Sequence, residues 1–159
     1  MTRAYIALGS NLADPVAQLG LAFDALGSLP QTRLVARSSL WRSAPVGYLD
    51  QPDFVNAVAA VDTGLTAETL LAHLLDIERR HGRVRGALNA PRTLDLDIAL
   101  YGTARVDTPD LTIPHPRMHE RAFVLLPLNE IAPDIAIPGH GALRDLLPGV
   151  AGQRLEVMS

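Results

Sequence analysis

Residues 43–53 read SAPVGYLDQPD and separate two stretches whose composition is typical of β-strands, residues 32–42 and residues 54–61. Proline and glycine punctuate this segment, so it is predicted to be a loop. Parallel neighbours in a sheet need a crossover of about a dozen residues or more, usually a helix. This short, turn-rich segment supplies no such helix. It therefore excludes a doubly wound parallel sheet and predicts an antiparallel pair.

Outward from this loop, strand and helix patterns follow one another in the order βαββαβ. The expected elements are strands at residues 5–8, 32–42, 54–61 and 94–101, and helices at residues 15–27 and 66–80. Asp14 is placed as the N-cap of the first helix, directly before Pro15. The order is that of the split βαβ, or ferredoxin-like, pattern. We therefore predict an α+β protein with a ferredoxin-like antiparallel sheet and helices packed on one face of it.

Weaker patterns follow this unit. Val106 and residues 111–113 are expected to form a hairpin, residues 117–129 a helix interrupted near Pro127, and residues 143–147 a short helix. The sequence contains neither a repeat nor a linker, so residues 1–159 are predicted to form a single domain.

The composition removes several kinds of chemistry. All 14 basic residues other than histidine are arginines, because the sequence contains no lysine, and it also contains no cysteine. A Schiff-base lysine, a P-loop lysine, a cysteine nucleophile, a cysteine-ligated metal and a disulfide are thereby excluded. The net charge of −3 argues against nucleic acid and anionic membranes as partners. No apolar run is long enough for a membrane span or a signal peptide, so we expect a cytoplasmic protein.

Residues 92–98, RTLDLDI, hold the clearest candidates for chemistry. Side chains alternate between the faces of a strand, so Asp95 and Asp97 are expected on one face, with Cα atoms about 6–7 Å apart. Two carboxylates at that spacing suit one hard divalent ion each, or two ions that bridge a polyphosphate. The alternative is an amphipathic strand with a solvated acidic face.

Arginines gather around these aspartates. Residues 79–121 contain eight of the 14 arginines but five acidic residues, so this window carries +3 and the rest of the chain −6. Arginine grips phosphoryl oxygens in two-point contacts, and the window therefore suits a polyphosphate that arrives with Mg²⁺. Arg79 and Arg80 have a simpler explanation, because cations are favourable at the end of a helix.

Two histidines occur in residues 114–121, PHPRMHER. On one helix His115 and His119 would share a face and suit zinc. The prolines on both sides of His115 place it outside a helix, however. Donation from His115 to a phosphate or ribose oxygen is therefore the favoured prediction.

Phe54 and Phe123 are two of only seven aromatic residues. A phenylalanine is usually a core residue, but Asn56 lies two positions after Phe54 and therefore on the same strand face. An aromatic ring beside a side-chain amide suits a flat heterocycle with a polar edge.

Six segments of the chain form a series of motifs: residues 5–12 (YIALGSNL), 50–57 (DQPDFVNA), 82–85 (GRVR), 91–98 (PRTLDLDI), 113–124 (IPHPRMHERAFV) and 127–133 (PLNEIAP). In this order, and over nearly the whole chain, they resemble the motifs of the 6-hydroxymethyl-7,8-dihydropterin pyrophosphokinase family of folate biosynthesis. The blocks at 91–98 and 113–124 are highly specific.

The resemblance implies transfer of the β,γ-pyrophosphoryl unit of ATP to the hydroxymethyl oxygen of the pterin, with release of AMP. It implies a monomer in which Asp95 and Asp97 hold two Mg²⁺ ions. The implied catalytic residues are Arg83, Arg92 and Asp97. The implied ATP-binding residues are Glu78, Arg85, Arg92, Ile98, Thr112, His115 and Arg121. The implied pterin-binding residues are Ser43, Ala44, Val46, Phe54, Asn56 and Phe123.

The chain departs from the family at one place. The family's loop before the PRTLDLD block often carries a tryptophan and an additional arginine, whereas residues 86–90, GALNA, contain neither. The resemblance therefore does not predict how this loop contacts the nucleotide.

Two other kinds of function remain open from the sequence. One is a metal-dependent phosphohydrolase that uses Asp95, Asp97, His115 and His119. The other is a non-catalytic module that binds a nucleotide or a pterin.

Overall fold

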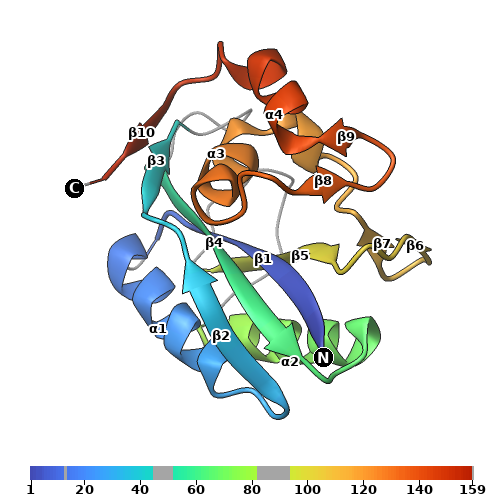
Figure 1. The fold of residues 1–159 in the computed structure, drawn as a ribbon. Coiled ribbons are helices and arrows are strands. Elements are labelled where there is room, and N and C mark those ends of the chain that lie inside the picture. Colours follow the sequence, from blue (N-terminus) through green and yellow to red (C-terminus); the bar gives the residue numbers. More distant parts are fainter. Residues whose placement is uncertain (13, 45–51, 82–93, 159) are drawn as a thin grey trace.

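The predicted antiparallel sheet forms the centre of the molecule. The computed structural model describes residues 1–12, 14–44, 52–81 and 94–158. In the main sheet the strands lie in the order β10-β3-β4-β1-β5, and β2 also pairs with β4 (Figure 1). These strands are β1 (Thr2–Ser10), β2 (Thr32–Arg37), β3 (Trp41–Ser43), β4 (Phe54–Thr63), β5 (Asp95–Tyr101) and β10 (Leu155–Val157). Every pairing among them is antiparallel.

Within the described residues, four α-helices and two 3₁₀ turns accompany the sheet. They are α1 (Pro15–Gly27), α2 (Ala67–Arg80), α3 (Ala122–Ile131), α4 (Leu143–Leu146), η1 (Met118–Glu120) and η2 (Leu147–Val150). The Asp14 carboxylate accepts a hydrogen bond from the N–H of Ala17, as predicted for an N-cap, and the Thr66 hydroxyl accepts one from Thr69. Both caps satisfy backbone donors that a helix leaves without partners.

Two small hairpins complete the fold. The predicted one joins β6 (Val106–Asp107) to β7 (Thr112–Ile113), and a second joins β8 (Ala136–Ile137) to β9 (Gly141–Ala142). Among the described residues, no helix combines the length and the apolar character that a membrane span requires.

Helices cover both faces of the sheet, so the prediction of one helical face is wrong. Alternate residues of β1 and β4, such as Ile6 and Ala57, pack under α1 and α2 in one apolar cluster. The residues between them, such as Tyr5 and Val58, pack under α3 and α4 in a second cluster. In Figure 1, α1 and α2 lie at the lower part of the sheet, and α3 and α4 at the upper part. The second helical layer comes from residues that follow the βαββαβ unit.

The stretch predicted as one strand over residues 32–42 is two strands. The N–H of Ser38 donates to the carbonyl of Val58, but the Ser38 hydroxyl, not its carbonyl, accepts from the Val58 N–H at 2.9 Å. This side-chain bond interrupts the regular ladder between β2 and β3.

The helix predicted over residues 117–129 is interrupted at Arg121, not near Pro127. Arg121 is extended, with φ −119° and ψ 110°, and separates η1 from α3. Pro127 lies within α3, where Val124, Leu125 and Leu128 are buried. Burial of this apolar stretch therefore offsets the hydrogen bond that the proline cannot donate.

Two other strands differ from the prediction in extent. β1 begins at Thr2 and continues through Gly9 and Ser10, because these residues pair with Asn56 and Val55. The strict alternation predicted for residues 94–101 ends after Ala99. Leu94, Leu96 and Ile98 share one cluster, as predicted, but Leu100 packs with Ala99 in the other, because the β1–β5 register shifts between Tyr5 and Ile6. The loop predicted over residues 82–91 lies outside the described residues.

Candidate active site

A cavity of about 530 Å³ lies on the sheet face that carries α3. Its floor continues the alternation of the strands: Ala7 and Gly9 on β1 and Asn56 on β4 point to the same face as the buried Tyr5 and Val58. Ala7 has only a methyl side chain and Gly9 has none, so they leave room above the sheet. The described lining residues that the sequence predicted are Ser43, Ala44, Phe54, Asn56, Asp95, Asp97, His115, Arg121 and Phe123.

The two aspartates lie on the edge strand of the sheet. Asp95 pairs with Gly9 and Asp97 with Ala7 across the β1–β5 ladder, so both carboxylates face the cavity as the alternation predicts. A second cavity, of about 710 Å³, also has Asp95 and Asp97 in its wall. The rest of that wall comes from Leu96 between them, from α2 and from residues 108–111. The carboxylates therefore stand where two cavities meet.

Glu78 of α2 contacts the backbone between the two aspartates. Its side chain is 3% exposed, and its Oε2 accepts a hydrogen bond from the N–H of Leu96 at 2.8 Å. β5 is the edge strand of the main sheet as far as the structure describes it, so this N–H has no further described strand to pair with. Glu78 thus fixes the strand segment from which Asp95 and Asp97 project.

His115 lies beside the aspartates with a defined orientation. Its Nδ1 accepts from the N–H of Arg117, so the neutral ring carries its proton on Nε2, which is 4.0 Å from Oδ2 of Asp97. Burial lowers the pKa of His115 below its usual value, the charge of Arg121 lowers it further, and Asp95 opposes the shift. The ring is therefore neutral near pH 7 and presents a hydrogen-bond donor.

Arg121 and Phe123 form the wall opposite the sheet. The guanidinium carbon of Arg121 lies 5.3 Å from the centroid of the Phe123 ring, within the range of a cation–π contact. Arg121 stands at the junction of η1 and α3, and Phe123 on the first turn of α3. The break at Arg121 is what directs both side chains to one cavity.

Asn56 is held in the opposite wall. It is buried, and its Nδ2 donates to the hydroxyl of Ser43 at 2.7 Å. A Cβ atom on Gly9 would lie 3.4 Å from Oδ1 of Asn56. Glycine at position 9 therefore leaves the space next to this amide oxygen open to a ligand.

Other residues singled out from the sequence lie elsewhere. Ile98 is buried in the cluster under α1 and α2, and Thr112 is exposed on β7. His119 stacks on His140, with ring centroids 4.0 Å apart, and lines neither cavity. Val46, Arg83, Arg85 and Arg92 lie outside the described residues, as does the departure at residues 86–90.

The C-terminal segment is a part of the wall that the sequence did not predict. Gln153, Arg154 and Leu155 line the first cavity, where β10 pairs with β3. No sequence pattern predicts this wall. The strand β10 is only three residues long, and it pairs with a strand more than a hundred positions earlier in the chain.

Asp95 and Asp97 have the chemistry for Mg²⁺. Mg²⁺ prefers hard oxygen ligands, and it usually takes one or two carboxylates and completes its shell with water and substrate phosphates. The described residues contain no group of three histidine, cysteine or acidic side chains placed to hold a metal ion without such help. The donor set therefore fits an ion that arrives with a polyphosphate.

Comparison with known proteins gives consistent matches. The family model described as 7,8-dihydro-6-hydroxymethylpterin-pyrophosphokinase (HPPK) matches residues 5–133. A Pseudomonas aeruginosa protein named 2-amino-4-hydroxy-6-hydroxymethyldihydropteridine pyrophosphokinase is 51% identical over 154 residues, which cover 97% of this chain and 95% of that protein. A Haemophilus influenzae protein of the same name is 48% identical, covering 98% and 97%.

The solved structures agree in fold. A crystal structure of an HPPK-DHPS protein in complex with substrates aligns with a TM-score of 0.74 at 13% identity. The alignment covers 92% of this chain and 43% of that one.

Proposed function

Because the chain belongs to the 7,8-dihydro-6-hydroxymethylpterin-pyrophosphokinase family, we propose that the two cavities meeting at Asp95 and Asp97 are where its reaction takes place. The enzyme transfers pyrophosphate from ATP to 6-hydroxymethyl-7,8-dihydropterin in folate biosynthesis. The hydroxymethyl oxygen forms a bond to the β-phosphorus of ATP, and the bond from that phosphorus to the oxygen shared with the α-phosphate breaks. The products are the pterin diphosphate and AMP.

The shared wall of the two cavities is the observation that carries the proposal. A transfer reaction needs its donor and acceptor in line, with the reacting group between them. The first cavity has aromatic and amide groups for the pterin, and the second extends from the same carboxylates toward α2. We place the pterin in the first cavity, the nucleoside of ATP in the second, and the β-phosphate at the aspartates.

The pterin is bound by an aromatic pair and an amide. Phe54 and Phe123 line the first cavity from opposite elements, β4 and α3, and are placed to stack on the two faces of a flat ring. Asn56, with Ser43 and Ala44 beside it, reads the polar edge of the ring. Val46, outside the described residues, is expected to complete this wall.

Asp95 and Asp97 are the residues that would hold two Mg²⁺ ions. When bound, these ions neutralise the charge of the triphosphate and orient it for in-line transfer. Asp97 also faces the first cavity, where it is placed to take the proton from the attacking hydroxyl group.

Cationic and neutral donors stabilise the transferred group. Arg121 and the Nε2–H of His115 reach into the first cavity beside the aspartates. Arg83, Arg85 and Arg92 are expected, from the sequence, to bind the phosphates as well. Preorganised donors of this kind stabilise the charge that spreads over the phosphoryl oxygens. Glu78, which lines the second cavity, is expected on the nucleoside side. Ile98 and Thr112 line neither cavity, so only the resemblance supports a role for them there.

Identification of the product formed from ATP tests the activity directly. Incubation with Mg-ATP and 6-hydroxymethyl-7,8-dihydropterin should give AMP and the pterin diphosphate in equal amounts. Release of ADP or of inorganic phosphate, or binding without turnover, would contradict the proposal.

The roles of the carboxylates are tested by substitution. Asp95→Ala and Asp97→Ala should each lower kcat by at least about 10²-fold, because each removes an ion ligand at the reacting phosphate. Asp107→Ala, which removes an exposed carboxylate on β6, is the matched control and should keep wild-type kcat. An active Asp97→Ala enzyme would rule out the ion site.

We also propose that residues 1–159 act as one catalytic domain, as a monomer in the cytoplasm. The near-complete coverage of relatives of similar length supports the single domain. Light scattering during size-exclusion chromatography should give a mass near 17.1 kDa.

A further inference from the structure

The peptide groups on both sides of Arg121 are bound by one distant side chain, that of Gln153. Its Nε2 donates to the carbonyl of Glu120 at 2.7 Å, and its Oε1 accepts from the N–H of Ala122 at 2.9 Å. These two backbone groups belong to the peptide units that precede and follow Arg121. The amide therefore restrains the backbone angles from which the Arg121 side chain projects.

The two bonds replace a helix cap that Arg121 does not supply. Arg121 occupies the N-cap position of α3 and makes no side-chain capping bond. Serine, threonine, aspartate and asparagine are the usual residues there, because their side-chain oxygen accepts from the first turn. An arginine has no acceptor. Gln153 provides the acceptor, so the cap position is free to carry a cation into the cavity.

Gln153 is itself held in place. Its N–H donates to the carbonyl of Val150 at 3.0 Å. Two residues further on, Leu155 begins β10 and pairs with Ser43 of β3. The segment from residue 153 to 155 thus connects the wall that contains Ser43 to the wall that contains Arg121 and Phe123, and it lines the cavity between them.

We propose that Gln153 is a positioning residue for pyrophosphoryl transfer, which holds Arg121 and Phe123 against the cavity through the backbone of Glu120 and Ala122. It touches neither substrate in this role. The inference rests on the proposed function of the cavity, because it assigns Gln153 to the placement of the proposed phosphate and pterin contacts. Loss of both bonds lets the η1–α3 junction move, and a displacement of about 1 Å at such contacts is enough to cost up to about 10²-fold in rate.

Steady-state kinetics with Mg-ATP and 6-hydroxymethyl-7,8-dihydropterin test this role. Gln153→Ala should lower kcat by about tenfold or more and raise the KM for the pterin. The measurement is made at a temperature where circular dichroism shows the variant fully folded. Glu156→Ala is the matched control, because it truncates an exposed side chain on β10, three residues after Gln153, and it should match the wild type.

A conservative variant separates positioning from general support of the fold. Gln153→Glu keeps the acceptor for Ala122 but, when ionised, loses the donor to Glu120. When protonated it regains that donor, so its rate relative to the wild type should rise as the pH falls toward the carboxyl pKa of about 4.3. If Gln153→Ala proves unfolded, the role is tested with Gln153→Glu alone, from its pH profile and its KM for the pterin.

The outcomes are distinguishable from failure of the proposed function. A wild-type protein that makes no AMP defeats the proposed function, whatever the variants do. Where the wild type is active, the inference is overturned if Gln153→Ala has a lower melting temperature but the kcat and KM of the wild type. It is also overturned if the rate of Gln153→Glu, relative to the wild type, does not change with pH.

Discussion

At the scale of single residues, the buried carboxylate of Glu78 shows how a functional strand is held. Its bond to the N–H of Leu96 satisfies a donor on the outer edge of β5. The neighbouring residues Asp95 and Asp97 pair with β1 on the inner edge. The short segment is therefore fixed from both sides. An unsatisfied buried donor would cost roughly 1–3 kcal/mol.

Truncation of Glu78 should therefore affect both stability and rate. Glu78→Ala should lower the free energy of unfolding by about 1–3 kcal/mol and kcat by about tenfold or more, because the strand that carries the aspartates is released. Glu78→Gln retains an acceptor oxygen, so its free energy of unfolding and its kcat should lie between those of Glu78→Ala and the wild type. Urea denaturation and steady-state kinetics measure the two effects.

Asp76→Ala is the matched control on α2. Asp76 is exposed and pairs with Arg79 and Arg80 on the surface, where ion pairs are worth little. Its stability and kcat should stay near those of the wild type. A Glu78→Ala enzyme that behaved like this control would contradict the positioning role.

At the scale of elements, α3 is joined to the β2–β3 connection by Glu130. Its carboxylate accepts from Nε1 of Trp41 at 2.6 Å and from both the N–H and the hydroxyl of Ser39. Trp41 begins β3, which ends at Ser43 in the cavity wall. The helix that presents Phe123 and the strand that presents Ser43 are thereby held at a fixed separation.

Loss of the Glu130 carboxylate should weaken the attachment of α3 to β3. Glu130→Ala should lower the free energy of unfolding by about 1.5–3 kcal/mol, the range for hydrogen bonds to a charged group. Trp41 is the only tryptophan, so its fluorescence reports the change directly. The emission of the folded variant should differ from that of the wild type.

The KM for the pterin should also rise in Glu130→Ala, because β3 and α3 form opposite walls. Glu156→Ala, on the strand that flanks β3 on its other side, controls for the loss of an acidic residue. Identical spectra and KM values for Glu130→Ala and the wild type would count against the coupling of the two elements.

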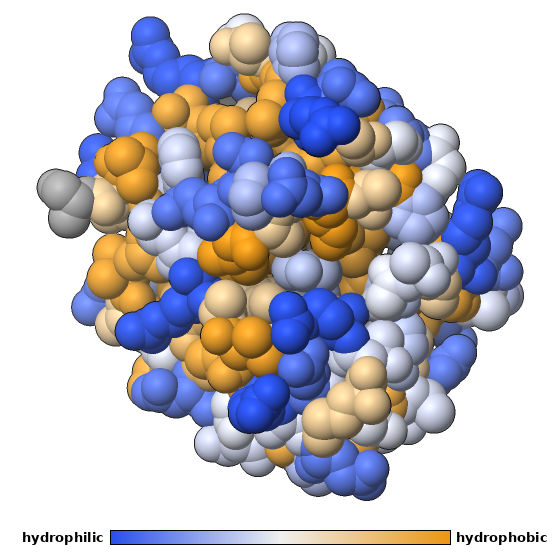
Figure 2. All heavy atoms as spheres, viewed as in Figure 1, coloured by the Kyte–Doolittle hydropathy of each residue, from blue (hydrophilic) through white to orange (hydrophobic). Residues whose placement is uncertain are grey.

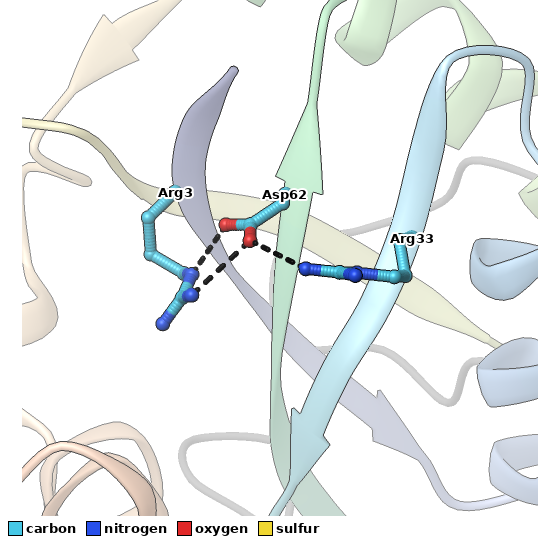
Figure 3. A network of polar contacts seen from close by, with 3 residues as sticks. All are labelled: Arg3, Arg33 and Asp62. Atoms are coloured by element: carbon cyan, nitrogen blue, oxygen red, sulfur yellow. Dashed lines mark hydrogen bonds and ion pairs between the residues drawn. The ribbon is translucent and has the colours of Figure 1, made fainter.

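At the scale of the whole molecule, ion pairs connect three strands at the end of the sheet where β1 begins. Asp62 of β4 lies between Arg3 of β1 and Arg33 of β2 (Figure 3), with Oδ1 2.5 Å from Nε of Arg3 and Oδ2 3.4 Å from a nitrogen of Arg33. The hydrogen bond from Arg3 holds the pKa of Asp62 below its usual value, against the opposing effect of desolvation, and Arg33 adds to the lowering. On the face drawn in Figure 2, hydrophilic and hydrophobic residues are interspersed.

This pKa shift predicts the sign of a pH dependence. A carboxyl group whose pKa is lower in the folded state adds stability above its unfolded pKa, about 3.9, and loses it as the pH falls through the folded pKa. The stability difference between the wild type and Asp62→Asn should therefore be constant above about pH 5 and shrink as the pH falls below the unfolded pKa. Denaturant titrations at a series of pH values measure it. A difference that persists unchanged at pH 2 would argue against these ion pairs.

Local sequence patterns predicted the parts of the fold that depend on local physics. The helix that follows Asp14 and Pro15, and the two aspartates on one strand face, required only capping and a period of two. The separation of β2 from β3 depends on a bond between Ser38 and Val58, and the break at Arg121 depends on Gln153. Both contacts join residues far apart in the sequence, so no local pattern contains them.

The same distinction applies to the site. Asp95, Asp97, Phe54, Asn56, Phe123, His115 and Arg121 were singled out from the sequence, and the structure brings them to one cavity. The second helical layer and the wall at residues 153–155 were not foreseen. Three exposed or half-buried residues after a short turn carry no pattern that predicts what they will face.

The central place of β1 also bears on how the protein folds. Gly9 pairs with Asn56 on one side and Asp95 on the other. The strand β1 can therefore pair only after residues much later in the chain have folded against it. Each such pairing closes a long loop, whose entropy is lost before the contact forms, and pairings of this kind slow folding. Asp95 and Asp97 pair with β1 and reach their places only when this topology is complete, so catalytic competence should be acquired late in folding.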